Sequence, residues 1–143
     1  MSVAPQLLDN VDTAVETIID RLGPDIRIGM PLGLGKPIQL INALYQRAKA
    51  DASLQLRILT ALSLEKPKPS SELEGRFLQP FIDRVFDDCP DLDYMKDLRA
   101  GRLPDNVQVL EFFFKPGSSL GNAHAQQHYI SSNYTHAARD VFS

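Results

Sequence analysis

The segment Asp25-Ile-Arg-Ile-Gly-Met-Pro-Leu-Gly-Leu-Gly-Lys-Pro37 decides the fold. It begins with apolar Ile26 and Ile28 alternating with charged residues, which predicts a strand. Three glycines follow, and residues 37–50 then carry apolar side chains at helical spacing. Glycine adopts positive φ freely and lets another group come close to the backbone. A strand, a glycine-rich turn and a helix in this order predict an α/β fold in which the turn lies near a ligand.

The glycine-rich turn fits neither of the common nucleotide-binding fingerprints. A Walker loop would need Gly where Met30 stands and a hydroxyl residue where Pro37 stands. A Rossmann fingerprint beginning at Gly33 would need Gly in place of Ile38. ATP and NAD are therefore disfavoured. Two interpretations stay open: a turn that holds a carboxylate or phosphate at the positive end of the following helix, and a tight connection without a ligand.

Length and composition predict one soluble domain over residues 1–143. The net charge is −3 and no Lys/Arg stripe is present, so we expect no nucleic-acid partner. The single Cys89 excludes an internal disulfide and is typical of a reducing cytosol. The first ten residues lack the pattern of a signal peptide, and no apolar run approaches the roughly 20 residues of a membrane span. We therefore expect a cytoplasmic protein without a membrane partner.

The rest of the chain continues the alternation of helices and strands. The run 54–64 starts with alternation and becomes nearly all apolar, which is typical of an inner strand covered on both faces of a parallel sheet. Pro80 is expected to break or kink the helical zone around it. The expected helices span residues 10–22, 37–50, 72–88, 91–99 and 121–130, and the expected strands span 25–28, 54–64 and 107–114. The prediction is an α/β fold with an open, mostly parallel sheet and flanking helices.

Two groups of potential metal ligands do not favour a metal site. Five Asp residues between positions 87 and 97 lack the central Gly and the terminal Glu of a calcium loop, and they are interpreted as a solvated face. His124 and His128 are four residues apart and share a face of a helix, which is a spacing that metal-binding pairs use. No Glu or Cys joins them, so no metal is expected.

The predicted sheet is small and has at least one unpaired edge. Parallel sheets are normally longer and well covered. We therefore expect the chain to be cut from something larger, or to find its missing strands in a partner. An exposed sheet edge also predicts self-association, and hence a homo-oligomer.

Five segments form a recognisable set: Ile28-Gly-Met-Pro-Leu-Gly-Leu-Gly-Lys-Pro37, Leu40-Ile-Asn-Ala-Leu44, Ile58-Leu-Thr-Ala-Leu-Ser-Leu64, Phe112-Phe-Phe-Lys-Pro-Gly117 and Tyr129-Ile-Ser-Ser-Asn-Tyr-Thr-His-Ala-Ala-Arg-Asp140. Together they resemble the acetyl-CoA hydrolase/transferase family, which contains the CoA transferases of the acetate and butyrate type. The resemblance covers nearly the whole chain from about Gly23. It implies an open α/β domain that occurs twice in a longer chain. It also implies an acyl-CoA and a small carboxylic acid as substrates, with no covalently bound cofactor.

The resemblance implies covalent catalysis by a glutamate that this chain does not supply. In the family, that glutamate attacks the thioester to give an acyl anhydride and then a glutamyl-CoA thioester. It belongs to the second half of the family's chain, so the partner would be a C-terminal catalytic domain. Glu65 and Glu111 lie near predicted strand ends but lack the family's surroundings. No residue of this chain is therefore assigned a catalytic role, and the chain alone is expected to be inactive.

The first domain's glycine turn is the part of the family's site that carries over. The resemblance implies that this turn lines the cleft between the two halves, where backbone N–H groups hold a carboxylate or the thioester oxygen. The residues expected to bind substrate are Gly29, Gly33, Gly35 and Lys36, with Asn133 and Tyr134 from the last matching segment. The alternative, that these glycines serve only to shape the domain, stays open.

Two other functions remain as alternatives. The first is a non-catalytic binding or scaffolding subunit of the same fold that pairs with a separate catalytic chain. The second is an enzyme similar to a sugar-phosphate isomerase, which would use the turn for an anion but would not account for the later matching segments. The sequence does not name the acyl group, and it does not separate transfer from hydrolysis.

Overall fold

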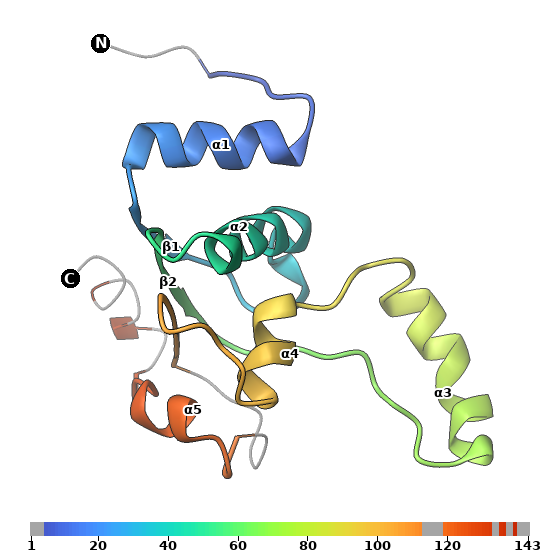
Figure 1. The fold of residues 1–143 in the computed structure, drawn as a ribbon. Coiled ribbons are helices and arrows are strands. Elements are labelled where there is room, and N and C mark those ends of the chain that lie inside the picture. The colour runs from blue at the N-terminus through green and yellow to red at the C-terminus, as the bar shows by residue number, and fades with distance from the viewer. Residues whose placement is uncertain (1–4, 113–118, 133–134, 137–138, 140–143) are drawn as a thin grey trace.

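The computed structural model describes residues 5–112, 119–132, 135–136 and 139, and these build a small parallel α/β sheet domain. The three strands are β1 (Asp25–Gly29), β2 (Gln55–Thr60) and β3 (Val107–Glu111), in the order β1-β2-β3 (Figure 1). Both pairings are parallel, with Ile28 opposite Ile58 and Ile58 opposite Val109. The predicted α/β class with an open parallel sheet and flanking helices is confirmed.

Five α-helices accompany the sheet in the described part of the chain. They are α1 (Val11–Leu22), α2 (Ile38–Ala50), α3 (Glu72–Val85), α4 (Asp93–Arg99) and α5 (Ala123–Gln127). The α1 helix begins at Asn10, whose side-chain oxygen accepts a hydrogen bond of 2.7 Å from the N–H of Thr13. It ends at Gly23, which has a φ of 77° that favours glycine. In Figure 1, α2 lies between α1 and the sheet, and α3 stands apart from both.

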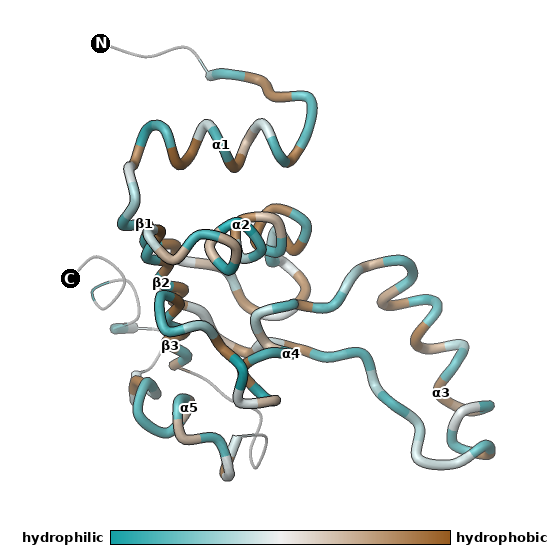
Figure 2. The backbone as a smooth tube through the Cα atoms, viewed as in Figure 1, coloured by the Kyte–Doolittle hydropathy of each residue, from teal (hydrophilic) through white to brown (hydrophobic). Residues whose placement is uncertain are grey.

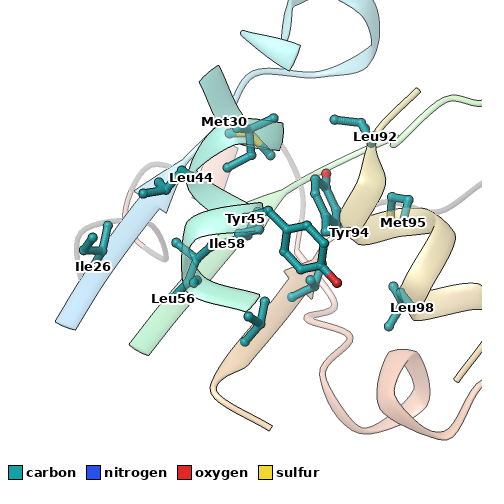
Figure 3. Packing of buried hydrophobic residues seen from close by; sticks show 14 of the residues in the cluster. Ile26, Met30, Leu44, Tyr45, Leu56, Ile58, Leu92, Tyr94, Met95 and Leu98 are labelled. Carbon is teal, nitrogen blue, oxygen red and sulfur yellow. The ribbon is translucent and has the colours of Figure 1, made fainter. Parts of the chain in front are cut away.

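The core lies between one face of the sheet and helices α2 and α4. Ile58 of β2, Leu44 and Tyr45 of α2 and Tyr94 of α4 are almost completely buried there (Figure 3). The rings of Tyr45 and Tyr94 meet edge to face, with centroids 6.4 Å apart. The apolar stripe predicted for residues 37–50 is confirmed, because four of its five members, Ile41, Leu44, Tyr45 and Ala48, are buried.

The opposite face of the sheet is polar in its amino-terminal part, whereas Leu59 and Leu110 on the same face are half-buried. Gln55 and Arg57 of the central strand β2 are exposed, and so are Asp25 and Arg27 of β1. The expectation that the central strand is covered on both faces is therefore wrong. It rested on the apolar end of the run 54–64, but β2 ends at Thr60 and the chain turns at Leu62, which has a φ of 48°.

Three other elements are shorter than the sequence predicted. The α3 helix ends at Val85, and Asp87, with a φ of 42°, cannot continue it. Pro80 lies inside α3, so it does not end the helix. The α5 helix covers five residues and begins after Asn122, which is its N-cap. The β3 strand ends at Glu111, and residues 113–114 of the expected strand lie outside the described residues.

Asn106 and the segment after α5 fix the position of β3. The side-chain amide of Asn106 donates to the carbonyl oxygens of Ala48 at 2.8 Å and Leu54 at 2.7 Å, which joins the start of β3 to the connection between α2 and β2. On the outer edge of β3, Tyr129 forms a parallel bridge with Glu111. The unpaired edge that the sequence predicted is therefore partly covered on this side.

Candidate functional site at the carboxyl edge of the sheet

The glycine segment, residues 29–36, runs along the carboxyl edge of the sheet. The N–H of Met30 continues the pairing with β2 by donating to Leu59 at 2.9 Å. The N–H of Gly33 donates to the carbonyl of Leu62, and the N–H of Gly35 donates to the carbonyl of Leu32, each at 3.2 Å. The carboxyl edge is where α/β proteins commonly place ligands. A ligand would bind these two N–H groups only by displacing a carbonyl oxygen of the chain.

The glycines have different structural roles in the segment. Gly29 is the last residue of β1. Gly33 has a φ of 55°, which a residue with a side chain rarely adopts. A Cβ atom at Gly35 would lie 3.8 Å from Pro31, an ordinary contact, so packing does not require glycine there. The sequence predicted that all three lie at one ligand-facing turn, and the structure places them at this edge.

Lys36 is buried, and its ammonium group is directed into the protein. It donates to the carbonyl oxygens of Pro31 at 2.8 Å and Ala61 at 2.7 Å, and so joins the glycine segment to the turn after β2. Burial lowers the pKa of Lys36 from 10.5 to about 8, against a smaller opposite effect from the charge of Glu111. In this arrangement Lys36 fixes the loop rather than offering its charge to a ligand.

Glu111 is the second buried charged group at this edge. It is 2% exposed, and its Oε1 accepts a hydrogen bond of 2.7 Å from the N–H of Ser63. Its Oε2 and the hydroxyl of Thr60 are buried side-chain atoms without a hydrogen-bond partner among the described residues. Burial raises the pKa of the Glu111 carboxyl above its usual range, although the Ser63 hydrogen bonds and the charge of Lys36 oppose this.

The sequence contained a signal for the burial of Glu111. Val107 and Val109 are buried residues of β3, and Glu111 continues their period of two onto the core face. Tyr94 also reaches this region, with its hydroxyl 3.2 Å from that of Ser63. Lys36, Glu111, Ser63 and Tyr94 thus form a buried polar cluster beneath the glycine segment. The sequence marked Lys36 as a candidate binding residue and Glu111 only as a glutamate near a strand end, and it predicted the burial of neither side chain.

A cavity of about 450 Å³ lies beside the glycine segment, where α2 begins. Its walls are mainly apolar. One wall comes from the loop and the first turn of α2, and the other from the start of α1 and the segment after α3. The lining residues are Val11, Leu34, Lys36, Pro37, Ile38, Gln39, Leu40, Asp88, Cys89 and Pro90. A helix N-terminus carries partial positive charge, so this cavity combines an apolar surface with a position that favours an anion.

The histidine pair lies at a different place, beside β3. His124 and His128 are stacked with ring centroids 4.0 Å apart, and they border a cavity of about 320 Å³ that also includes Arg57. The Nε2 atom of His124 accepts a hydrogen bond of 3.2 Å from the N–H of Val109, which ties α5 to the strand edge. Burial, and then the neighbouring His128, lower the pKa of His124. Within the described part of the chain, no three His, Cys, Asp or Glu residues gather as a metal site.

Two of the predicted binding residues, Asn133 and Tyr134, lie outside the described residues. Comparison of the chain with protein-family models, with curated proteins and with solved structures gives no match. Among the helices of the described residues, none is both long and apolar enough to cross a bilayer. The fold and the site therefore define the chain as a parallel α/β domain with a glycine-rich carboxyl edge and an apolar cavity beside it.

Proposed function

We propose that this chain is the N-terminal domain of a CoA transferase or acyl-CoA hydrolase. In this proposal the glycine segment and the neighbouring cavity form one side of the cleft for the acyl-CoA and the carboxylic acid. The catalytic glutamate comes from a C-terminal domain that follows this sequence in a longer chain. The observation that carries the proposal is the apolar cavity of about 450 Å³ that borders the glycine segment at the start of α2.

Two features of the cavity suit different parts of an acyl-CoA: its apolar wall suits the apolar parts, and the nearby helix N-terminus suits the anionic groups. Its apolar wall, formed by Leu34, Pro37, Ile38 and Leu40, suits an acyl chain or the pantetheine arm, because their transfer from water is favourable. The N-terminus of α2 favours a carboxylate or a phosphate. The glycines allow a thioester to come close to the backbone.

Glu111 is unsuited to be the attacking carboxylate. Its side chain is buried and held by Ser63, and its raised pKa favours the protonated form, which is not nucleophilic. The proposal therefore keeps nucleophilic attack outside this chain. The attack of an external glutamate on the thioester carbonyl forms the acyl anhydride and releases CoA as a thiolate. The thiolate then attacks the glutamyl carbonyl of the anhydride, which gives the glutamyl-CoA thioester and releases the original acyl group as its carboxylate.

Binding of acetyl-CoA by this chain tests the proposal without requiring catalysis. We expect isothermal titration calorimetry to detect binding to the wild-type chain. Leu34→Asp should weaken binding by about tenfold or more, because it places a negative charge and a polar group in the cavity wall. Leu32→Asp is the matched control, since Leu32 is a similarly exposed leucine of the same loop but does not line the cavity.

Three results would overturn the proposal. The first is the absence of acetyl-CoA binding, and the second is equal weakening by Leu34→Asp and Leu32→Asp. The third comes from an activity assay with acetyl-CoA and a short carboxylic acid, in which full turnover by this chain alone would contradict the assignment of the nucleophile to another domain. Tighter binding of a sugar phosphate than of acetyl-CoA would favour the isomerase-like alternative instead.

A further inference from the structure

The α3 helix exposes a long apolar stripe to solvent. The helix stands away from the sheet and the other helices (Figure 1), and none of its residues is buried. Four large apolar side chains recur at every fourth position, and apolar colour recurs along this helix in Figure 2. Their exposed fractions are 78% for Leu73, 82% for Phe77, 50% for Phe81 and 40% for Val85. An apolar stripe of this kind marks a surface that binds another protein segment.

Local interactions alone support α3 weakly. Ser71 caps it by accepting a hydrogen bond of 3.2 Å from the N–H of Glu74, and Arg76 forms an exposed ion pair with Glu72. Against these, the helix contains Gly75 and Pro80, the two residue types with the lowest helix propensity. A helix of 14 residues with such a composition is marginal in water, so burial of its apolar face would stabilise it substantially.

The residues of the stripe are arranged symmetrically about Gln79. Leu73 and Val85 are equally far from Gln79 in the sequence, and so are Phe77 and Phe81. If two copies of α3 pack antiparallel about a two-fold axis at the level of Gln79, each Phe77 lies at the level of Phe81 of the other copy. A two-fold interface uses the same patch on both subunits, so it requires this self-complementarity.

The charges on the same face follow the same symmetry. Glu74 and Arg84 are also equally far from Gln79, and at about 100° per residue both lie within the arc that the four apolar residues span. Within the described part of the chain, Arg84 has no ion-pair partner, while Glu74 accepts a hydrogen bond of 2.7 Å from the N–H of Ser70 through Oε2. In the antiparallel pair, Glu74 of each copy lies at the level of Arg84 of the other.

We propose that α3 is the dimerisation helix of this protein and that its partner is α3 of a second copy, packed antiparallel about a two-fold axis that passes through the apolar stripe at the level of Gln79. The Phe77 and Phe81 side chains form the centre of the contact, and the pairs of Glu74 with Arg84 set its register. This inference does not depend on the acyl-CoA proposal, because it rests on a helix that is separate from the glycine segment.

Sedimentation velocity of the 143-residue chain provides the first test. We expect the wild-type chain to form a dimer at micromolar concentration. Phe77→Asp should raise the dissociation constant of the dimer by about thirtyfold or more, because it places charge at the centre of the apolar contact. Leu120→Asp is the matched control, since Leu120 is also 80% exposed but lies outside α3, and this variant should dimerise normally. Circular dichroism of both variants establishes that each is folded.

A charge exchange tests the register separately. In Glu74→Arg alone, or in Arg84→Glu alone, like charges face each other at both ends of the pair, so each variant should be more monomeric than the wild type. An equimolar mixture of the two variants brings opposite charges together at both ends, and it should restore the dimer. A monomeric wild-type chain, a dimer unaffected by Phe77→Asp, or a mixture no more associated than its components would each overturn the proposal.

Discussion

The ammonium group of Lys36 donates a hydrogen bond of 2.7 Å to the carbonyl oxygen of Ala61, and this contact joins the glycine segment to the turn after the central strand. A second hydrogen bond, to Pro31, closes the loop on itself. The buried ammonium group of Lys36 therefore fixes the loop on the side that faces the protein interior. This arrangement leaves the outer side of the segment, with Leu34 and Pro37, to line the cavity.

The first prediction concerns the stability that Lys36 provides. Lys36→Met should lower the free energy of unfolding by about 1–3 kcal/mol, because it leaves two carbonyl oxygens without their donor. Lys68→Met, at an exposed lysine of the loop after β2, is the control and should change stability little. Urea denaturation measures both. Equal stability of the two variants would show that Lys36 does not anchor the loop.

The lowered pKa of Lys36 predicts a specific pH dependence. Between a pKa of about 8 in the folded state and 10.5 in the unfolded chain, the unfolded state binds more protons. The contribution of Lys36 to stability should therefore rise as the pH increases through this range. The difference in stability between wild type and Lys36→Met, measured against pH, isolates this contribution from other titrating groups. A difference that stays constant or shrinks across the range would contradict the assigned pKa.

Burial of the Glu111 carboxyl should lower the stability of the protein as the pH rises, which is the opposite pH dependence from that of Lys36. Its folded pKa lies above the unfolded value of 4.5, so stability is lost as the pH rises from the unfolded pKa through the folded one. Glu111→Gln keeps an oxygen for the N–H of Ser63 and removes the charge. We expect this variant to gain stability relative to wild type on going from about pH 5 to about pH 8, because only the wild type has a buried carboxyl group to ionise over that range. A relative loss over that range would be inconsistent with a buried carboxylate.

A third polar contact joins α2 to α4 at Asp97, and its contribution to stability should depend on pH in the opposite direction from that of Glu111. The hydroxyl of Tyr45 donates to Asp97 at 2.7 Å, and Lys49 donates to the same carboxylate at 2.6 Å. Lys49, and then Tyr45, lower the pKa of Asp97, so the stability from this carboxylate is present above pH 3.8 and is lost as the pH falls through the folded pKa.

Tyr45→Phe should accordingly cost about 1.5–3 kcal/mol near neutral pH, as expected for a buried hydrogen bond to a charged acceptor. The cost should shrink once Asp97 is protonated. Lys49→Met is the comparison, and it should cost less, about 1 kcal/mol at most, because Lys49 is half-exposed and its ion pair is screened. Denaturation curves at neutral and acidic pH measure both variants, and the opposite ranking would refute this account of the contact.

Much of the fold could be predicted because its signals are local. The alternation around Ile26 and the stripe from Ile41 to Ala48 depend only on neighbours in the sequence, and both appear as expected. The expectation of a central strand covered on both faces rested on the apolar residues up to Leu64, but β2 ends at Thr60 and Leu62 turns the chain at a positive φ. The exposed side chain of Arg57 shows that the amino-terminal part of the other face is open.

The site was less predictable than the fold because it depends on contacts between segments that are distant in the sequence. The glycines drew attention to a segment that lies at the carboxyl edge of the sheet, but sequence spacing could not show that the amine of Lys36 donates to carbonyl oxygens on its inner side. Nor could it show that Cys89, more than fifty residues from the loop, lines the cavity beside Leu34. Such contacts depend on how distant segments meet, and no local pattern encodes them.

The alkylation rate of Cys89 tests the central claim most directly, because this single cysteine lines the cavity beside the glycine segment. Modification by a maleimide can be followed by intact-protein mass spectrometry with and without acetyl-CoA, whose own sulfur is blocked. If acetyl-CoA occupies the cavity, a concentration about ten times its dissociation constant should slow the modification of Cys89 by about tenfold, and Leu34→Asp should abolish this protection. An unchanged alkylation rate at saturating acetyl-CoA would contradict the account.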